Sequence, residues 1–115
     1  MADAPVTSGV TLVEDFESAD DFDKKHTPYI EFCGKDGVTS VCVTVGHEVP
    51  HPNEPGHFID WIELQANGAP IARFDLSPAV TAPVVSIKVE LEPGTTLRAL
   101  EHCNLHGVFA YEVTV

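Results

Sequence analysis

Positively charged residues are scarce in this sequence. Its 115 residues include six lysines and arginines against 18 aspartates and glutamates, which gives a formal net charge of −12 at pH 7. A chain with this excess of negative charge is repelled by nucleic acids and by anionic membrane surfaces. We therefore expect neither nucleic acid nor membrane among its partners.

Long apolar stretches are also missing. No run of 18 apolar residues is present, so the sequence predicts no membrane-spanning helix. The first ten residues, MADAPVTSGV, have neither the basic start nor the apolar segment of a secretory signal, so we expect a cytoplasmic protein. The length predicts a single domain over residues 1–115, with a flexible tail at residues 1–9.

Cysteine is too sparse for a disulfide framework, since the chain has only three cysteines and no visible secretion signal. Cys33 and Cys42 flank residues 34–37, Gly-Lys-Asp-Gly, which are typical of a hairpin turn. If Cys33 pairs with Val38, Cys42 lies four positions further along, at roughly 13 Å. That separation is too large for a disulfide bond, so we predict that both are reduced thiols.

Alternation of apolar and polar residues predicts about seven short strands. The expected strands cover residues 29–33, 38–45, 57–66, 71–76, 84–91, 96–102 and 108–115, with a further ordered segment at 10–13. One face of the first hairpin is assigned to the core, namely Ile30, Phe32, Val41, Val43 and Val45. Residues 14–25 are expected to form an acidic loop with room for one helical turn. This pattern predicts an all-β fold, a seven-stranded immunoglobulin-like β-sandwich.

Histidine and cysteine are placed where several of them can reach one metal ion. Cys103 and His106 have C-x-x-H spacing at the end of a predicted strand, where a tight turn presents both side chains the same way. His51 and His57 border a loop stiffened by three prolines, so their imidazoles can converge from its two ends. His26 is a further candidate. We interpret the remaining two histidines, His47 and His102, as surface or hydrogen-bonded residues.

The ratio of imidazole to thiol narrows the choice of metal. Zinc, copper and iron all accept these ligands, but a structural zinc site stops at four ligands and is usually richer in cysteine. A blue-copper site usually has a methionine shortly after its second histidine, and the only methionine here is Met1. Haem attachment would need a C-x-x-C-H motif, which is absent. Iron remains, with a cupredoxin-like electron carrier and a metal-binding module for partner recognition as alternatives.

Three stretches together resemble a known family. KHTPYIE at 25–31, VGHEVPHPNEPGHFIDWIEL at 45–64 and CNLHG at 103–107 are similar to superoxide reductases of the small, single-iron neelaredoxin type. The iron domain of desulfoferrodoxin is related to these proteins. The resemblance runs from Lys25 to Val115. No rubredoxin-like domain with a CxxC motif precedes it, so we expect the single-iron form.

The resemblance implies a site and a reaction. His26, His51, His57 and His106 would be equatorial ligands of one iron per chain, and Cys103 would be the axial ligand. The family reduces superoxide to hydrogen peroxide by one electron without producing dioxygen. Lys25 matches its catalytic lysine. Reduced rubredoxin or a similar small carrier would be the electron donor, and the relatives form homodimers or homotetramers.

One position departs from the family pattern. Family members commonly carry Glu-Lys-His, whose glutamate binds the ferric iron, whereas this sequence has Lys24 at the glutamate position. We predict that water, hydroxide or a buffer anion caps the ferric form, unless Glu48 or Glu54 takes over. His47 stands where the family often has lysine, so the local field is expected to depend more strongly on pH.

Overall fold

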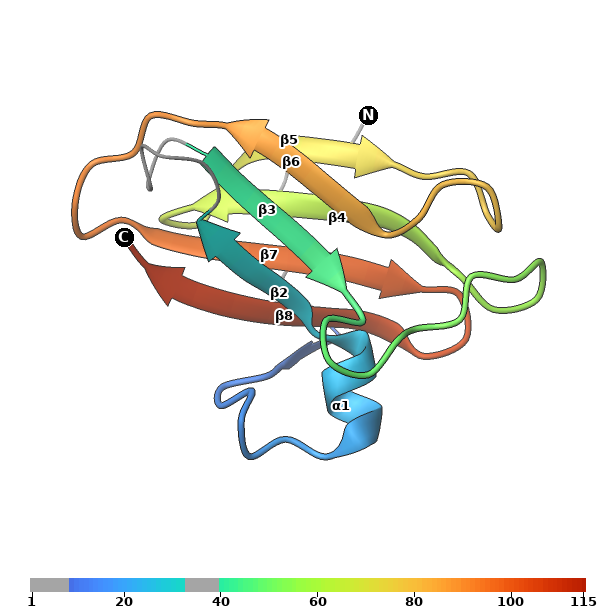
Figure 1. Cartoon of the computed structure of the whole chain (residues 1–115). Helices are drawn as coiled ribbons and strands as arrows, with labels where there is room; N and C mark the ends of the chain where they lie inside the picture. Colours follow the sequence, from blue (N-terminus) through green and yellow to red (C-terminus); the bar gives the residue numbers. More distant parts are fainter. Residues whose placement is uncertain (1–8, 33–39) are drawn as a thin grey trace.

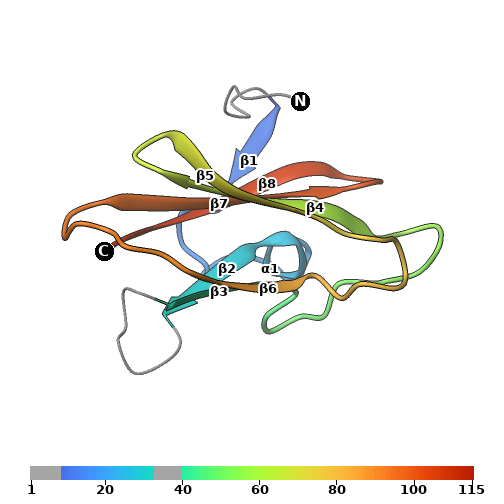
Figure 2. The ribbon, with the colours of Figure 1, turned by 90° about the horizontal axis from the view of Figure 1, so that it is seen from above.

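The computed structural model describes residues 9–32 and 40–115, which form two β-sheets packed face to face (Figures 1 and 2). The elements are β1 (Val10–Leu12), α1 (Asp21–His26), β2 (Pro28–Phe32), β3 (Ser40–Val45), β4 (Ile59–Ala66), β5 (Ala69–Asp75), β6 (Val84–Lys88), β7 (Thr96–Cys103) and β8 (Gly107–Thr114). One sheet has the order β1-β8-β7-β4-β5 and the other β2-β3-β6. The predicted all-β, immunoglobulin-like sandwich is confirmed. The tail predicted at residues 1–9 lies outside the described residues, apart from Gly9.

The core lies between the inner faces of the two sheets. Its buried members are Ile30, Val41, Val43, Val45, Ile59, Ile62, Leu64, Val85, Leu97, Ala99 and Cys103. Burying one such aliphatic side chain contributes about 1.5–3 kcal/mol, so this cluster is the main source of stability. Phe32, which we predicted in the core, is 38% exposed because it is the last residue of the edge strand β2.

The predicted register of the first hairpin is wrong by two residues. The expected pairing would place Cys42 opposite Tyr29, whereas Cys42 lies opposite Glu31, closer to the end of the hairpin. Cys42 is disulfide-bonded, so the prediction of a reduced thiol at this position is also wrong. The distance on which that prediction rested came from the incorrect register. Cys33 and the turn expected at residues 34–37 lie outside the described residues.

Helix α1 forms where the sequence predicted an acidic loop with one helical turn. The side chain of Asp20 caps its N-terminus by accepting a hydrogen bond of 2.8 Å from the Asp23 N–H. Acidic residues occupy its first turn and basic residues its last turn, which matches the helix dipole. The Thr27 hydroxyl donates to the Asp23 carbonyl, and Pro28 then begins β2. Helix α1 therefore ends at His26, next to the sandwich.

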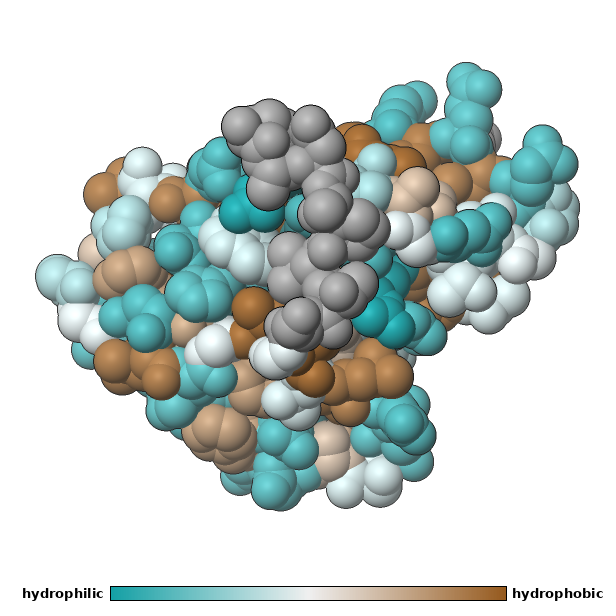
Figure 3. Space-filling view, turned by 180° about the vertical axis from the view of Figure 1, so that it is seen from behind, coloured by the Kyte–Doolittle hydropathy of each residue, from teal (hydrophilic) through white to brown (hydrophobic). Residues whose placement is uncertain are grey.

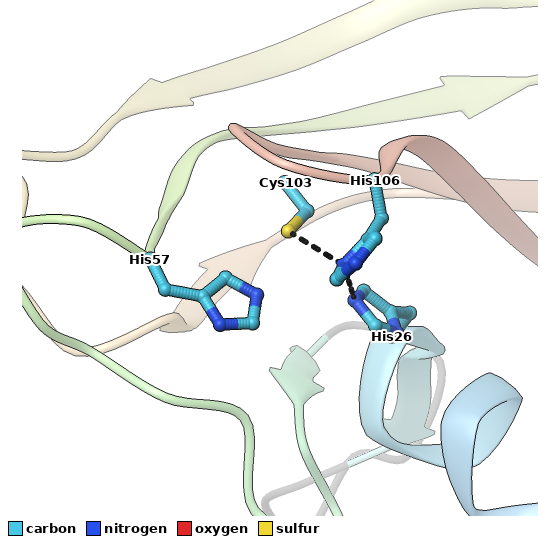
Figure 4. Close-up of side chains that lie close together, drawn as sticks. All are labelled: His26, His57, Cys103 and His106. Carbon is cyan, nitrogen blue, oxygen red and sulfur yellow. Dashed lines mark hydrogen bonds between the residues drawn. The ribbon is translucent and has the colours of Figure 1, made fainter.

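Three segments meet at one end of the sandwich. They are the C-terminus of α1, the loop of residues 46–58 between β3 and β4, and the turn between β7 and β8 (Figures 1 and 4). All of the predicted metal ligands lie on these segments. In the part of the chain that the structure describes, no helix has the length and apolar character needed to cross a membrane.

Candidate metal centre

Four of the five predicted ligands meet at one point. The ligand atoms of His26, His57, Cys103 and His106 all lie within 4.8 Å of one another. Figure 4 shows these side chains pointing toward one another from α1, from the segment that precedes β4 and from the turn between β7 and β8. The structure thus brings together residues that are as many as 80 positions apart in the sequence.

His51 lies outside this group of four, but the His51 ring is a close neighbour of the rings of His26 and His57. Its ring centre is 4.8 Å from that of His26 and 4.6 Å from that of His57. The ring of His106 lies on the other side, 4.9 Å from His26 and 5.3 Å from His57. The separation between His26 and His57 is longer, 6.4 Å. His51 and His106 are therefore each close neighbours of both His26 and His57, so that the four rings form one cluster.

Backbone hydrogen bonds orient two of these rings. The Nδ1 atoms of His26 and His51 each donate to a carbonyl oxygen at 2.7 Å, on Phe22 and Pro52 respectively. An imidazole that donates through one nitrogen keeps a lone pair on the other, which is the arrangement found in metal-ligating histidines. In both residues Nε2 keeps its lone pair, and in His26 this nitrogen lies 3.1 Å from Nδ1 of His106.

Two buried nitrogen atoms lack a hydrogen-bond partner among the described residues. They are the Nε2 atoms of His51 and His57. An unpaired polar atom in the interior costs about 1–3 kcal/mol, so native proteins rarely leave one unsatisfied. A metal ion between the rings would satisfy both atoms. The residues present therefore fit a metal of the kind that accepts imidazole and thiolate.

The thiol of Cys103 lies at the same point and is fully buried. Its sulfur is 3.7 Å from Nδ1 of His106. Burial raises the pKa of this thiol, while hydrogen bonds from the backbone N–H groups of Leu105 and His106 act in the opposite direction. Because a metal binds the thiolate, binding must release the thiol proton.

Burial favours the neutral form that a metal requires in His26, His51 and His57. Burial lowers the pKa values of His26 and His57, and it lowers the pKa of His51 to about 4. The positive charge of Lys25 adds to this lowering for all three rings. The Lys25 ammonium is therefore close enough to influence the centre electrostatically.

Lys24 points to a different partner. Its Nζ lies 3.2 Å from a carboxylate oxygen of Glu48, and it is 5.4 Å from the centre of the Phe16 ring. Only 17% of the Lys24 side chain is exposed. This pair joins α1 to the loop of residues 46–58. Lys24 and Glu48 are 24 positions apart in the sequence, so no local sequence pattern predicted this ion pair.

The other two histidines lie outside the centre, as predicted. His102 makes a 2.7 Å contact with Asp60, and its ring stacks on Trp61. The exposed His47 stacks on Tyr29 with 4.1 Å between the ring centres. Neither belongs to the group of residues that could hold a metal ion.

Two residues near the centre, Phe109 and Glu101, were not predicted from the sequence. Phe109 stacks on His26 with 4.6 Å between the ring centres. Glu101 is fully buried two residues before Cys103 on β7. The signal for Glu101 was present, because residues two apart on a strand share a face and Cys103 faces the interior. Only the structure, however, shows Phe109 against a candidate ligand.

A β-sandwich that brings three histidines and a cysteine together at one end, with a fourth histidine beside them, has the donor set of a metal-binding protein. A family model described as desulfoferrodoxin matches residues 18–112. The chain therefore belongs to the desulfoferrodoxin family, as a member of its superoxide reductases. This family implies iron as the metal.

Individual relatives agree with this assignment. A putative superoxide reductase of Methanocaldococcus jannaschii is 46% identical over 99 residues, covering 80% of this chain and 83% of that protein. The superoxide reductase of Thermococcus kodakarensis is 35% identical over 113 residues, covering 90% and 98%. Among solved structures, the superoxide reductase (neelaredoxin) from Archaeoglobus fulgidus in the reduced form has a TM-score of 0.69 and 34% identity, covering 84% and 94%. These similarities favour the superoxide reductase interpretation over the cupredoxin-like alternative.

Proposed function

We propose that this protein reduces superoxide to hydrogen peroxide at a mononuclear non-haem iron. One superoxide takes up one electron and two protons, so that no dioxygen is formed. The observation that supports this proposal best is the cluster of four imidazole rings with a buried thiol beside three of them. His26, His51, His57 and His106 would be the equatorial ligands, and Cys103 the axial ligand. This arrangement leaves one position for the substrate.

When bound, iron would supply the electron and the open coordination position. Cys103 would donate electron density through its thiolate, which favours reduction of the substrate. The N–H groups that point to this sulfur would tune that donation. Neutral imidazoles add no negative charge, so the centre stays attractive to an anion. Burial, which lowers the pKa values of three of the rings, supports that neutral form.

Lys25 is the residue that we propose to act on the substrate directly. Its ammonium would attract superoxide toward a protein whose overall charge is −12. It would also hold a water molecule in place to deliver a proton to the reduced substrate. The influence of its charge on three of the four rings supports this placement.

The oxidised form should differ from that of relatives with a glutamate before the lysine. Lys24 occupies that position here, and its ion pair engages Glu48, one of the two carboxylates considered as a replacement. We therefore propose that water, hydroxide or a buffer anion fills the open position after turnover. Absorption spectra of the ferric protein over a range of pH, with and without azide, would test this point.

The reaction can be tested on protein reconstituted with ferrous iron under anaerobic conditions. Rapid mixing with superoxide should yield close to one hydrogen peroxide per superoxide and no dioxygen. His57→Ala should bind iron more weakly and lose activity. His47→Ala should keep the iron affinity and activity of wild type, because the His47 ring lies outside the group of candidate ligands. Release of dioxygen, or wild-type iron affinity in His57→Ala, would contradict the proposal.

We further propose that the chain acts as one domain over residues 1–115, as a homodimer or homotetramer in the cytoplasm. A small electron-transfer protein such as reduced rubredoxin would supply the electron. Light scattering during gel filtration would give the oligomeric state. Mixing the ferric protein with reduced rubredoxin should re-reduce it at a rate that rises with rubredoxin concentration. A monomer, or no reduction by rubredoxin, would contradict the respective statement.

A further inference from the structure

Asn104 connects the turn between β7 and β8 to the segment that carries His57. Its backbone N–H donates to the carbonyl of Phe58 at 3.1 Å. Its side-chain oxygen accepts a hydrogen bond of 2.8 Å from the N–H of Phe58, and its side-chain nitrogen donates to the carbonyl of Gly56 at 3.0 Å. The three bonds thus engage the residues immediately before and after His57.

His57 has few other anchors. The Nδ1 atoms of His26 and His51 donate to backbone carbonyls, whereas the ring of His57 makes no hydrogen bond within the described residues. Within the described part of the chain, the backbone of His57 pairs only with Glu54, which closes a short turn. The regular pairing of β4 with β7 begins after it, at Ile59. The hydrogen bonds of Asn104 therefore tie the residues on both sides of His57 to the turn that follows Cys103.

We propose that Asn104 is a positioning residue that holds His57 at its place in the metal centre. The inference rests on the proposed function, in which His57 is a ligand. An asparagine suits this role because its short side chain carries one acceptor and one donor on a rigid planar group. Those two atoms bracket His57 from both sides. Figure 4 shows the turn that carries Cys103 and His106 beside the segment that carries His57.

Removing the Asn104 side chain should weaken metal binding. Loss of a residue that orients a ligand typically lowers metal affinity or activity by about 10–100-fold. In Asn104→Ala the backbone bond to Phe58 remains, but both side-chain bonds are lost. We expect Co²⁺ to bind about 10–100-fold more weakly, with altered ligand-field bands. The thiolate-to-cobalt absorption should persist, because Cys103 is held by its own pairing on β7.

A double-mutant cycle separates positioning from a general structural role. The dissociation constant for Co²⁺ is measured by competition with a chelator in wild type, Asn104→Ala, His57→Ala and the double variant. If Asn104 acts through His57, Asn104→Ala should have no further effect once His57 has been removed. Asn104→Asp keeps the acceptor for Phe58 and loses the donor to Gly56. It should show a smaller loss of affinity, and it replaces the alanine variant if that variant does not fold.

Asn67→Gly is the matched control. The side-chain oxygen of Asn67 accepts a hydrogen bond of 3.0 Å from the Thr96 N–H at the far end of β4 and β7. Asn67 has a φ of 49°, which glycine adopts without strain. The control thus loses a similar bond away from the centre and should bind Co²⁺ like wild type.

The outcomes distinguish the two proposals. Binding by Asn104→Ala within twofold of wild type, or an equal loss in the His57→Ala background, would overturn the role of Asn104 alone. Failure of the wild-type protein to bind Co²⁺ or Fe²⁺ would overturn the proposed function, and this inference with it. Weaker binding that is confined to proteins containing His57 would support both.

Discussion

Glu101 is a buried acid without a hydrogen-bond partner for either carboxylate oxygen within the described residues. Burial, reinforced by the negative charge of Asp60, raises its pKa well above the usual value of 4.5. The carboxyl group is therefore neutral in the folded protein at a pH where it ionises in the unfolded chain. Folding stability should be highest below that usual pKa and should decrease as the pH rises toward the folded-state pKa.

Glu101→Gln should remove this pH dependence, because the amide has nearly the same shape and does not ionise. We expect the metal-free variant to gain stability relative to wild type as the pH rises from 5 to 8, by about 1–3 kcal/mol at the upper end. Urea unfolding at both pH values would measure the difference. Glu90→Gln, at an exposed position, is the control and should leave the pH dependence unchanged. A constant gap between Glu101→Gln and wild type would argue against a neutral Glu101.

Lys24 offers a second test at the scale of one residue. Lys24→Glu would place a carboxylate where the family commonly has one and would remove the ion pair with Glu48. We expect this carboxylate to compete with added anions, so that azide binds the ferric protein about tenfold more weakly, equivalent to ~1.4 kcal/mol. Azide titration followed by absorption would measure the effect.

Lys24→Gln is the appropriate comparison, because it removes the same ion pair without adding a carboxylate. Its azide affinity should stay close to that of wild type. Equal weakening in both variants would instead show that the ion pair, which joins α1 to the loop of residues 46–58, controls access to the centre.

At the scale of the element, the loop of residues 46–58 depends on one glycine. Gly46 has a φ of +91°, and a Cβ atom added there would lie 2.5 Å from the backbone nitrogen of His51. The left-handed backbone alone costs a residue with a Cβ about 1–2 kcal/mol. The contact with His51 adds to this cost because backbone atoms cannot move aside easily. The first turn of the loop therefore sets the position of a predicted ligand.

We expect Gly46→Ala to lower the free energy of unfolding by about 2 kcal/mol or more and to reduce the iron content. Gly56→Ala is the matched control in the same loop, because a Cβ there would meet nothing within 4 Å and no positive φ is required. Urea unfolding and metal analysis of both variants would provide the measurements. Full iron retention in Gly46→Ala would mean that the turn at Gly46 does not set the position of His51.

Helix α1 and the strands around it show how local sequence prepares the centre. Its N-cap, Asp20, begins the helix at Asp21, and the C-cap Thr27 followed by Pro28 ends it at His26. The turn between β7 and β8 likewise places Cys103 and His106 at the two ends of one short hairpin turn, with Cys103 opposite Gly107. Each element thus delivers its own side chains, whereas contacts between elements decide where those side chains meet.

At the scale of the whole molecule, the net negative charge opposes the approach of superoxide. The face seen in Figure 3 mixes hydrophilic and hydrophobic residues outside the grey atoms, and the net charge of −12 repels an anionic substrate. Lys25 provides positive charge next to the centre. Salt weakens the repulsion by distant negative charges more than the attraction by the nearby Lys25, because the Debye length is about 10 Å at 0.1 M salt.

Removing Lys25 should expose the repulsion by the whole molecule. We expect Lys25→Ala to react with superoxide about tenfold more slowly at low salt, and its rate constant should rise as salt screens the net negative charge. Pulse radiolysis at several ionic strengths would measure both effects. Lys88→Ala changes the net charge by the same amount. Lys88 pairs with Ser40 at the start of β3, which is the end of this strand farther from residues 46–58. This variant should therefore retain the wild-type rate constant. Equal slowing of both variants would show that Lys25 acts only through net charge.

The strands, and the residues that meet at the centre, were largely predictable from the sequence. Apolar alternation is a property of neighbouring residues, so it revealed strands such as β6 and β7 without knowledge of their partners. The short spacing of Cys103 and His106 likewise reflects one hairpin turn. The convergence of His51 and His57 followed from the loop that they border.

Other features were decided only by the tertiary structure. The pairing of Lys24 with Glu48 spans 24 positions, and the bond from Asn104 to Gly56 spans 48. The register of β2 and β3 differed by two residues from the one that the turn motif predicted. The sequence by itself therefore determined which residue types were available and on which local elements they lie. Their separations, burial and partners arose only when the two sheets packed, because these depend on chain segments far apart in the sequence.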